Sequence, residues 1–223
     1  AAEGLCGSGL VDLLAELRRS DLMGANGVLT DGVSELTIVP DRGITFSRAF
    51  TEFAGTTQAE CLDIGCAYGV ATLPALANGA RVLACDLEPR HLEILARRVP
   101  PGDRERVRSE PGSLPEVDFP AGSFGAILCA RTLHFLRARD IELTVRKMYD
   151  WLIPGGRIFL ITDSPYVGPW WKSAAEYERR KREGCPWPGF VQNYGALLPP
   201  GTDVSKHPSF IHPLDPDILR RVA

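Results

Sequence analysis

From Glu60 onward, short apolar segments alternate with segments of helical periodicity. Strands are predicted at 61–64, 81–85, around Val107, at 124–130 and at 157–162. Helices are predicted between them at 68–77, from Pro89 onward, and after an N-cap at Asp140. Strands and helices that alternate in this way form a parallel sheet with right-handed crossovers. We therefore predict an α/β fold: a Rossmann-like, doubly wound, mostly parallel sheet.

A glycine-containing turn follows the first predicted strand, with the sequence DIGCAYG at 63–69. Ligands bind at such a junction in doubly wound sheets. The G-x-x-x-G spacing differs from the G-x-G-x-x-G of dinucleotide sites. Asp63 precedes the first glycine by two residues, where its charge can help hold the ammonium group of a methionine moiety, directly or through water. Asp86, after the second strand, can accept hydrogen bonds from two ribose hydroxyls. The alternative is a structural turn that binds nothing.

Four stretches, in this order, resemble the class I S-adenosylmethionine-dependent methyltransferases: CLDIGCAYG (61–69), LACDL (83–87), SFGAIL (123–128) and LIPGGRIFL (152–160). The resemblance implies the methyltransferase fold over about residues 50–223, with S-adenosylmethionine as cofactor. It implies that the glycine turn packs on the methionine part and that Asp86 binds the ribose. The cofactor-binding residues predicted on this basis are Asp63, Gly65, Cys66, Ala67, Tyr68, Gly69, Asp86, Leu87, Ser113, Leu114, Cys129 and Ala130.

The chain departs from the family at three places. Ala67 stands where members often have glycine, which hinders close approach of the backbone. Ser113-Leu114-Pro115 lies where an acid is usual after the third strand, with Glu110 nearby, so the adenine contact is not defined by sequence. Gly125 replaces a common aspartate in the fourth strand.

Three residues are catalytic candidates: His134, in the loop after the fourth strand, and Asp163 and Tyr166, after the fifth. Methyl transfer from a sulfonium needs mainly alignment and desolvation, with a base only where the acceptor requires one. His134 could be that base, or it could simply pack or donate a hydrogen bond.

Residues 164–216 hold many prolines and little periodicity, and we interpret them as an excursion on the substrate side of the sheet. Its aromatic side chains either wall an acceptor pocket or form a lid or minor core: Trp170, Trp171, Tyr177 and Trp187. The basic run 179–182 is flanked by acids and fits a solvated helix face better than a phosphate site.

The chain has 223 residues and a formal net charge of −3, which argues against general affinity for nucleic acid or an acidic membrane. It has no apolar run near the ~20 residues needed to cross a bilayer and no signal-like start, so we expect a cytoplasmic protein. None of the six cysteines forms a C-x-x-C pair, and we predict reduced thiols and no metal site. The oligomeric state is not predicted.

Both ends of the chain are unusual for the family. The last residues, 220–223, fall where a helix and then an antiparallel hairpin should follow, so we expect the sheet to lack its last two strands. Residues 1–47 are predicted as an N-terminal appendage with a helix and short strands at 35–40 and 43–46. Through the stretch GLCGSGLVDLLAEL (4–17), residues 1–47 resemble a fragment of the actin-like ATPases that reductively activate corrinoid proteins, although the other phosphate-binding segments are absent. Residues 48–223 form the predicted methyltransferase domain.

Three functions remain open. The first is methyl transfer from S-adenosylmethionine to a small-molecule acceptor. The second is a non-catalytic S-adenosylmethionine-binding or interaction module. The third is a fragment related to corrinoid activation, for which ATP binding would be the signature.

Overall fold

The structure, a computed structural model, describes residues 44–166, 168–198 and 201–223. The helix and the first short strand expected within residues 1–43, and almost all of the resemblance to corrinoid-activating ATPases, lie outside the described residues. No helix among those described is long and apolar enough to span a membrane.

The described residues form one five-stranded sheet in the order β3-β2-β1-β4-β5, with every neighbouring pair parallel. Its strands are β1 (Glu60–Ile64), β2 (Val82–Asp86), β3 (Val107–Pro111), β4 (Phe124–Ala130) and β5 (Leu152–Ile161). Strands β2 and β3 are added on one side of β1, whereas β4 and β5 are added on its other side, so the strand order reverses between β1 and β4. This arrangement confirms the predicted Rossmann-like sheet, and all five strands end at the same edge.

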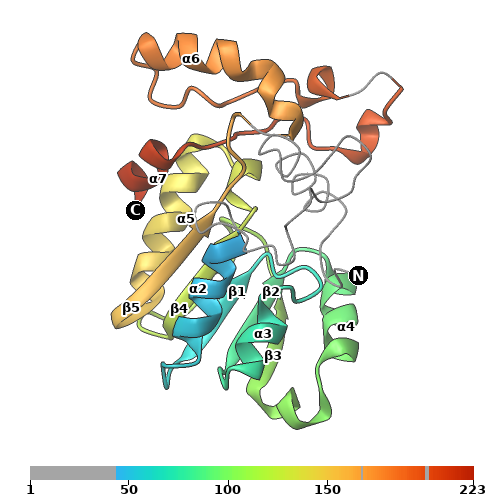
Figure 1. Cartoon of the computed structure of the whole chain (residues 1–223), viewed down its shortest axis with the longest axis vertical. Helices are drawn as coiled ribbons and strands as arrows, with labels where there is room; N and C mark the ends of the chain where they lie inside the picture. Colours follow the sequence, from blue (N-terminus) through green and yellow to red (C-terminus); the bar gives the residue numbers. More distant parts are fainter. Residues whose placement is uncertain (1–43, 167, 199–200) are drawn as a thin grey trace, which may run out of the picture.

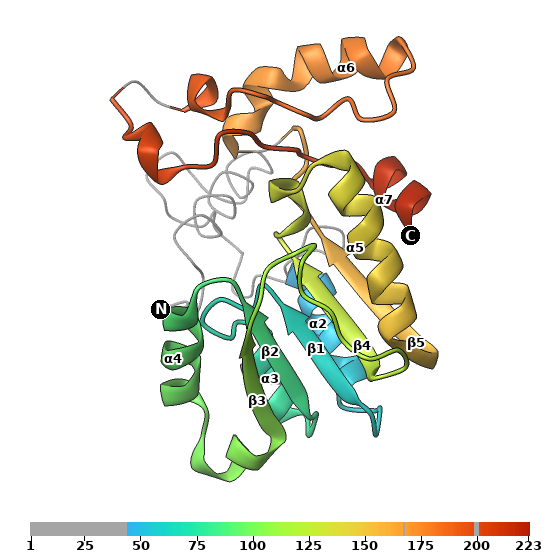
Figure 2. The same cartoon turned by 180° about the vertical axis from the view of Figure 1, so that it is seen from behind.

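Helices cover both faces of the sheet (Figures 1 and 2). The helices are α2 (Ile44–Ala54), α3 (Thr72–Ala77), α4 (Pro89–Arg98), α5 (Ala138–Trp151), α6 (Ala174–Arg182) and α7 (Pro216–Val222). Side chains alternate along β1, so Leu62 and Ile64 pack with α5 and α7, whereas Cys61 packs with α2, α3 and α4. Each face thus has its own apolar core, which holds the sheet edge in a fixed position.

The strand expected at 43–46 is wrong for residues 44–46, which form the start of α2. Phe50 and Ala54, four residues apart, are fully buried against the sheet, and Phe50 meets Phe159 of β5 edge-on with ring centroids 5.7 Å apart. Residues 44–46 are therefore helical because the helix they begin buries Phe50 and Ala54 against the sheet, although their local sequence pattern resembles a strand. Helix α2 runs across the boundary predicted between residues 47 and 48.

Two helix starts also differ from those predicted. Helix α3 begins at Thr72 rather than at 68, because positive φ angles in the preceding turn keep it out of the helix. Helix α5 has Arg137 as its N-cap, and Asp140 lies inside the first turn, where its charge suits the helix dipole.

Strand β5 is longer than predicted and contains the Pro154-Gly155-Gly156 turn as an irregularity. Phe124 pairs with Leu152, whereas Ala126, two residues later, pairs with Arg157. Gly155, with φ +79°, allows the extra residues to be accommodated.

Short 3₁₀ segments complete the secondary structure: η1 (Pro101–Arg106), η2 (Leu133–Phe135), η3 (Gly168–Ser173), η4 (Tyr194–Leu197) and η5 (Val204–Lys206). The excursion, with α6, η4 and η5, lies over the carboxyl ends of the strands (Figure 1). Two backbone hydrogen bonds fasten its returning end, from His212 N–H to the His134 carbonyl (2.8 Å) and from Leu214 N–H to the Asp163 carbonyl (3.0 Å). The returning chain therefore lies directly against the loops that follow β4 and β5.

Candidate functional site

The turn after β1 is held by backbone geometry that only a few residue types tolerate. Gly65, Ala67 and Gly69 have φ angles of +76°, +46° and +82°. A Cβ atom on Gly65 would lie 2.3 Å from Thr132 Oγ1, so the loop after β4 closes directly onto the turn. Ala67 occupies the left-handed region that favours glycine, and this conformational cost adds to the hindered backbone approach expected from the sequence at this position.

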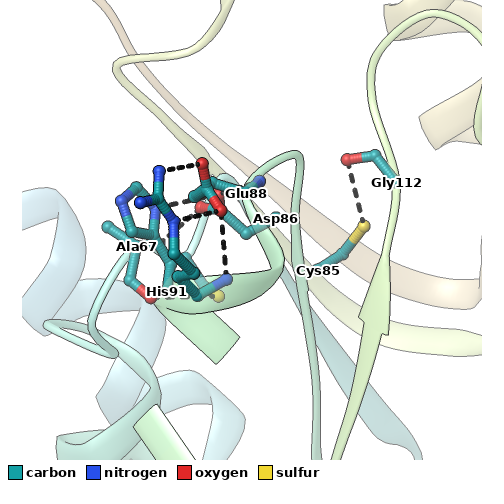
Figure 3. A network of polar contacts seen from close by, with 8 residues as sticks. Ala67, Cys85, Asp86, Glu88, His91 and Gly112 are labelled. Atoms are coloured by element: carbon teal, nitrogen blue, oxygen red, sulfur yellow. Dashed lines mark hydrogen bonds and ion pairs between the residues drawn. The ribbon is translucent and has the colours of Figure 1, made fainter. Parts of the chain in front are cut away.

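Asp86, the last residue of β2, joins the turn to the next helix (Figure 3). Its Oδ2 accepts a hydrogen bond from the Ala67 N–H at 2.8 Å, and its Oδ1 accepts one from the Glu88 N–H at 2.9 Å. The Nδ1 atom of His91 lies 3.0 Å from the same Oδ1. Asp86 is 8% exposed, so this carboxylate is a well-ordered acceptor at the strand edge.

Asp63 lies beneath the turn and is buried. Its Oδ2 accepts a 2.6 Å hydrogen bond from the Thr72 hydroxyl at the start of α3. Burial raises the pKa of the Asp63 carboxyl to about 6, against the opposing effect of its Thr72 hydrogen bonds. Asp63 therefore carries most of its negative charge at neutral pH in a poorly solvated position, where a nearby cation would be stabilised.

The remaining predicted cofactor residues differ in accessibility. Leu87 is 73% exposed and Tyr68 is 40% exposed, so both offer apolar surface beside Asp86. The Ser113 hydroxyl donates to Glu116 Oε2 at 2.9 Å, and Leu114 packs in the core on the α5 face. Cys66 is also buried, and burial raises the pKa of its thiol.

The end of β4 lies next to the turn. Cys129 is buried in the core, and burial raises the pKa of its thiol to about 12, so it remains protonated at neutral pH. The Ala130 carbonyl accepts a 3.1 Å hydrogen bond from the Thr132 hydroxyl. Arg131 has φ +56°, a second non-glycine residue in the left-handed region, immediately after the strand.

Two of the three catalytic candidates lie together. His134 is 2% exposed, and its Nε2 atom is 3.9 Å from Asp163 Oδ2, beyond hydrogen-bond distance. Asp163 Oδ2 instead accepts hydrogen bonds of 3.3 Å from Trp170 Nε1 and Arg131 Nη2. Burial lowers the pKa of His134 to about 4, so its imidazole is neutral at pH 7. Tyr166 is separate from this pair, because its hydroxyl donates to Glu178 on α6.

The aromatic residues of the excursion mostly form a minor core. Trp170 is buried with Tyr194 and Ile211, and Tyr177 is buried against Asp215, to which its hydroxyl donates. Trp187 packs at the edge of the main core, whereas Trp171 and Tyr166, at 63% and 44% exposure, face solvent. The basic run on α6 pairs with acids, including Arg179 with Glu176 and Glu183, as expected for a solvated helix face.

Sequence reasoning missed His91 and Thr132 at this edge of the sheet, and it named Trp170 only as a pocket or lid residue, without its contact to Asp163. His91 lies in the first turn of α4, five residues after Asp86, so a histidine shortly after the acid was an available signal. Thr132 and Trp170 meet Gly65 and Asp163 only through the packing of separate strands, and no local pattern marks them.

Comparison with known proteins shows a similarity over part of the chain. Residues 61–156 match a family described as "Methyltransferase domain". A curated relative from Rhodobacter capsulatus, named magnesium-protoporphyrin O-methyltransferase, is 30% identical over 100 residues, which cover 45% of this chain and 42% of the relative. The chain thus matches less than half the length of that relative.

Solved structures share the architecture. An S-adenosylmethionine-dependent methyltransferase from Mesorhizobium loti aligns with a TM-score of 0.55 and 22% identity, over 79% of this chain and 76% of that chain. One from Methanosarcina mazei aligns with a TM-score of 0.55 and 18% identity, over 73% and 76%. Residues 61–156 are thus similar to the methyltransferase domain family, and the chain has the Rossmann-like fold seen in the S-adenosylmethionine-dependent methyltransferases with which it aligns.

Proposed function

We propose that this protein binds S-adenosylmethionine at the carboxyl ends of β1, β2 and β4 and transfers its methyl group to a small-molecule acceptor. The observation that carries the proposal is the 2.8 Å hydrogen bond from the Ala67 N–H to Asp86 Oδ2. It joins the glycine turn to the acid after β2 at the edge where the strand order reverses, the position at which doubly wound sheets bind ligands.

The cofactor has three parts, and the edge offers a distinct environment for each. The positive-φ turn lets the backbone approach the methionine moiety, with the charge of Asp63 beneath it to favour the ammonium group. Asp86 is the acceptor for the ribose hydroxyls. The exposed Leu87 offers an apolar surface to the adenine ring. Ser113, Leu114, Cys129 and Ala130 remain predicted cofactor-side positions.

The bound cofactor supplies an electrophilic methyl group whose leaving thioether is neutral. The protein's part is therefore alignment of the acceptor and exclusion of water. We place the acceptor on the side of His134 and Asp163, where the excursion covers the strand ends. His134 and Asp163 remain the catalytic candidates on this side, although a pKa lowered to about 4 makes the His134 imidazole a weak base at pH 7. Tyr166 is a weaker catalytic candidate because its hydroxyl is bound to Glu178.

The acceptor class is supported by the curated relative, whose name describes O-methylation of magnesium-protoporphyrin, a small molecule. An oxygen nucleophile on a small molecule is thus the first class to test. A screen would follow methyl transfer from labelled S-adenosylmethionine to porphyrin carboxylates, phenols and aliphatic acids.

Calorimetry tests cofactor binding directly on the full chain. We expect micromolar binding of S-adenosylmethionine by the unmodified protein, at least about tenfold weaker binding by Asp86→Ala, and unchanged binding by Asp217→Ala, which removes an exposed acid on α7. ATP and NAD serve as ligand controls. Binding of ATP in place of S-adenosylmethionine, or no binding by a folded sample, would overturn the proposal.

A further inference from the structure

The side chain of His91 projects from the first turn of α4 toward the Asp86 carboxylate (Figure 3). Its Nδ1 lies 3.0 Å from Asp86 Oδ1. The carboxylate can only accept, so Nδ1 must carry the hydrogen in this contact. The Tyr68 ring meets the imidazole edge-on with ring centroids 4.7 Å apart, which fixes the ring from its other side. His91 is therefore held between the glycine turn and the acid.

The two carboxylate oxygens of Asp86 accept different numbers of hydrogen bonds. Each carboxylate oxygen has two lone pairs. Oδ1 accepts from the Glu88 N–H and from His91, which fills both. Oδ2 accepts a hydrogen bond from the Ala67 N–H and from no other group in the described part of the chain. The geometry therefore leaves Oδ2 as the oxygen with capacity for a further donor.

The other acid near His91 is already engaged. Glu88 binds Arg90 through two hydrogen bonds of 2.9 Å, from Nε to Oε1 and from Nη2 to Oε2. It also accepts from the Arg90 N–H and so caps α4. Glu88 is thereby turned toward Arg90, and Asp86 is the acid that the imidazole contacts.

We propose that His91 is a positioning residue for the ribose subsite. It holds Asp86 Oδ1 so that Oδ2 points toward the ligand and accepts a hydrogen bond from one ribose hydroxyl. This inference rests on the proposed S-adenosylmethionine site and deepens it: the acid serves one ribose hydroxyl rather than both, because the histidine occupies the other oxygen.

The test is a comparison of two ligands with two substitutions at position 91. S-adenosylhomocysteine and its 2′,3′-dideoxyribose analogue are titrated into the full chain, and the dissociation constant of each is measured. If one ligand binds too weakly for direct titration, it is measured by competition against the other. His91→Leu removes the donor, whereas His91→Asn keeps an N–H group near the position of Nδ1. His207→Leu, at an exposed histidine in the excursion, is the matched control.

We expect His91→Leu to weaken S-adenosylhomocysteine about tenfold and the dideoxy analogue less than about twofold, since only the former uses Asp86 through its ribose. His91→Asn should recover most of the affinity, and His207→Leu should change neither ligand. Equal losses for both ligands, or no loss in a folded His91→Leu variant, would overturn the inference. Failure of the unmodified chain to bind S-adenosylhomocysteine would instead remove the proposed function on which it rests.

Discussion

Gly125 in β4 packs so closely against Thr57 that a Cβ atom at position 125 would lie 2.3 Å from Thr57 Oγ1. This contact leaves no room for a larger side chain at position 125. We expect Gly125→Ala to lower the free energy of unfolding by about 1–3 kcal/mol, because the strand or the segment before β1 must shift. Urea unfolding followed by circular dichroism measures the change.

The same contact gives a rescue experiment. Thr57→Ala removes the hydroxyl and methyl groups that the new Cβ would meet, although Thr57 Cβ stays 3.0 Å away. The double variant Gly125→Ala/Thr57→Ala should therefore recover part of the lost stability, with a coupling of about 1 kcal/mol. Strict additivity of the two single changes would contradict a direct clash.

Ala67 carries a left-handed backbone conformation at φ +46°. Ala67→Gly should raise the stability of the ligand-free chain by about 0.5–1 kcal/mol, since relief of the ~1–2 kcal/mol strain exceeds the entropic cost of glycine. Ala96→Gly, on the exposed side of α4, should lower stability by about 1 kcal/mol. Thermal unfolding of both variants would show shifts of opposite sign, and a loss in both would contradict strain at Ala67.

The raised pKa of Asp63 predicts how cofactor affinity depends on pH. With a pKa of about 6, Asp63 is ionised above this pH and attracts an ammonium group, and it becomes neutral as the pH falls through 6. Affinity for S-adenosylhomocysteine should therefore decline between pH 7 and 5, by at most about tenfold per pH unit. Asp63→Asn should bind more weakly at pH 7 and show a shallower pH dependence. An unchanged slope in this variant would mean that Asp63 does not contact the ligand electrostatically.

Acid should also lower the stability of the fold, because the buried His134 resists protonation. Its pKa is lowered from 6.5 to about 4, so the unfolded chain takes up the proton first as the pH falls. The stability that neutral His134 provides is complete above pH 6.5 and is lost progressively toward pH 4, by up to about 3 kcal/mol. His134→Leu should reduce the slope of unfolding free energy between pH 6.5 and 4. Parallel slopes for the two proteins would show that His134 is solvated in solution.

Asp215 fastens α7 to α6. Its Oδ1 accepts the Ile218 N–H at 2.8 Å, and its Oδ2 accepts Lys181 Nζ at 2.6 Å together with the Tyr177 hydroxyl. We expect Asp215→Ala to cost about 3 kcal/mol, because it removes a helix cap and leaves the buried Tyr177 hydroxyl without its acceptor. The exposed Asp217→Ala, which also loses a contact with Lys181, should cost under about 1 kcal/mol. Similar costs for both would contradict the capping role.

The sheet could be predicted from sequence because its central strands are short, apolar and buried on both faces. β1, β2 and β4 all lie in such runs, and their parallel order follows from the helices between them. The strand expected at 43–46 failed because its neighbours complete a helix whose apolar side is satisfied only by contact with β5. The sequence around residues 43–46 gives no information about that contact, because Phe159 lies more than 100 residues farther along the chain.

The site was predictable where a residue follows directly from a strand end. Asp86 and the glycine turn meet because parallel strands end at the same edge, and His134 and Asp163 meet for the same reason. Tyr166, three residues farther along, is carried away by the excursion to Glu178. The burial that gives Asp63 and His134 their shifted pKa values arises from packing of distant segments, which spacing alone does not reveal.

Among the described residues, two backbone–backbone hydrogen bonds join the returning end of the excursion to the loops after β4 and β5, and His212 Nδ1 also lies 3.2 Å from the Leu136 carbonyl. Backbone bonds of this kind do not depend on side-chain identity, so most substitutions at those four positions preserve them. These backbone bonds therefore survive side-chain changes elsewhere in the excursion and leave the sheet edge its geometry. A chain built in this way separates the segment that lies over the strand ends from the sheet that positions those ends.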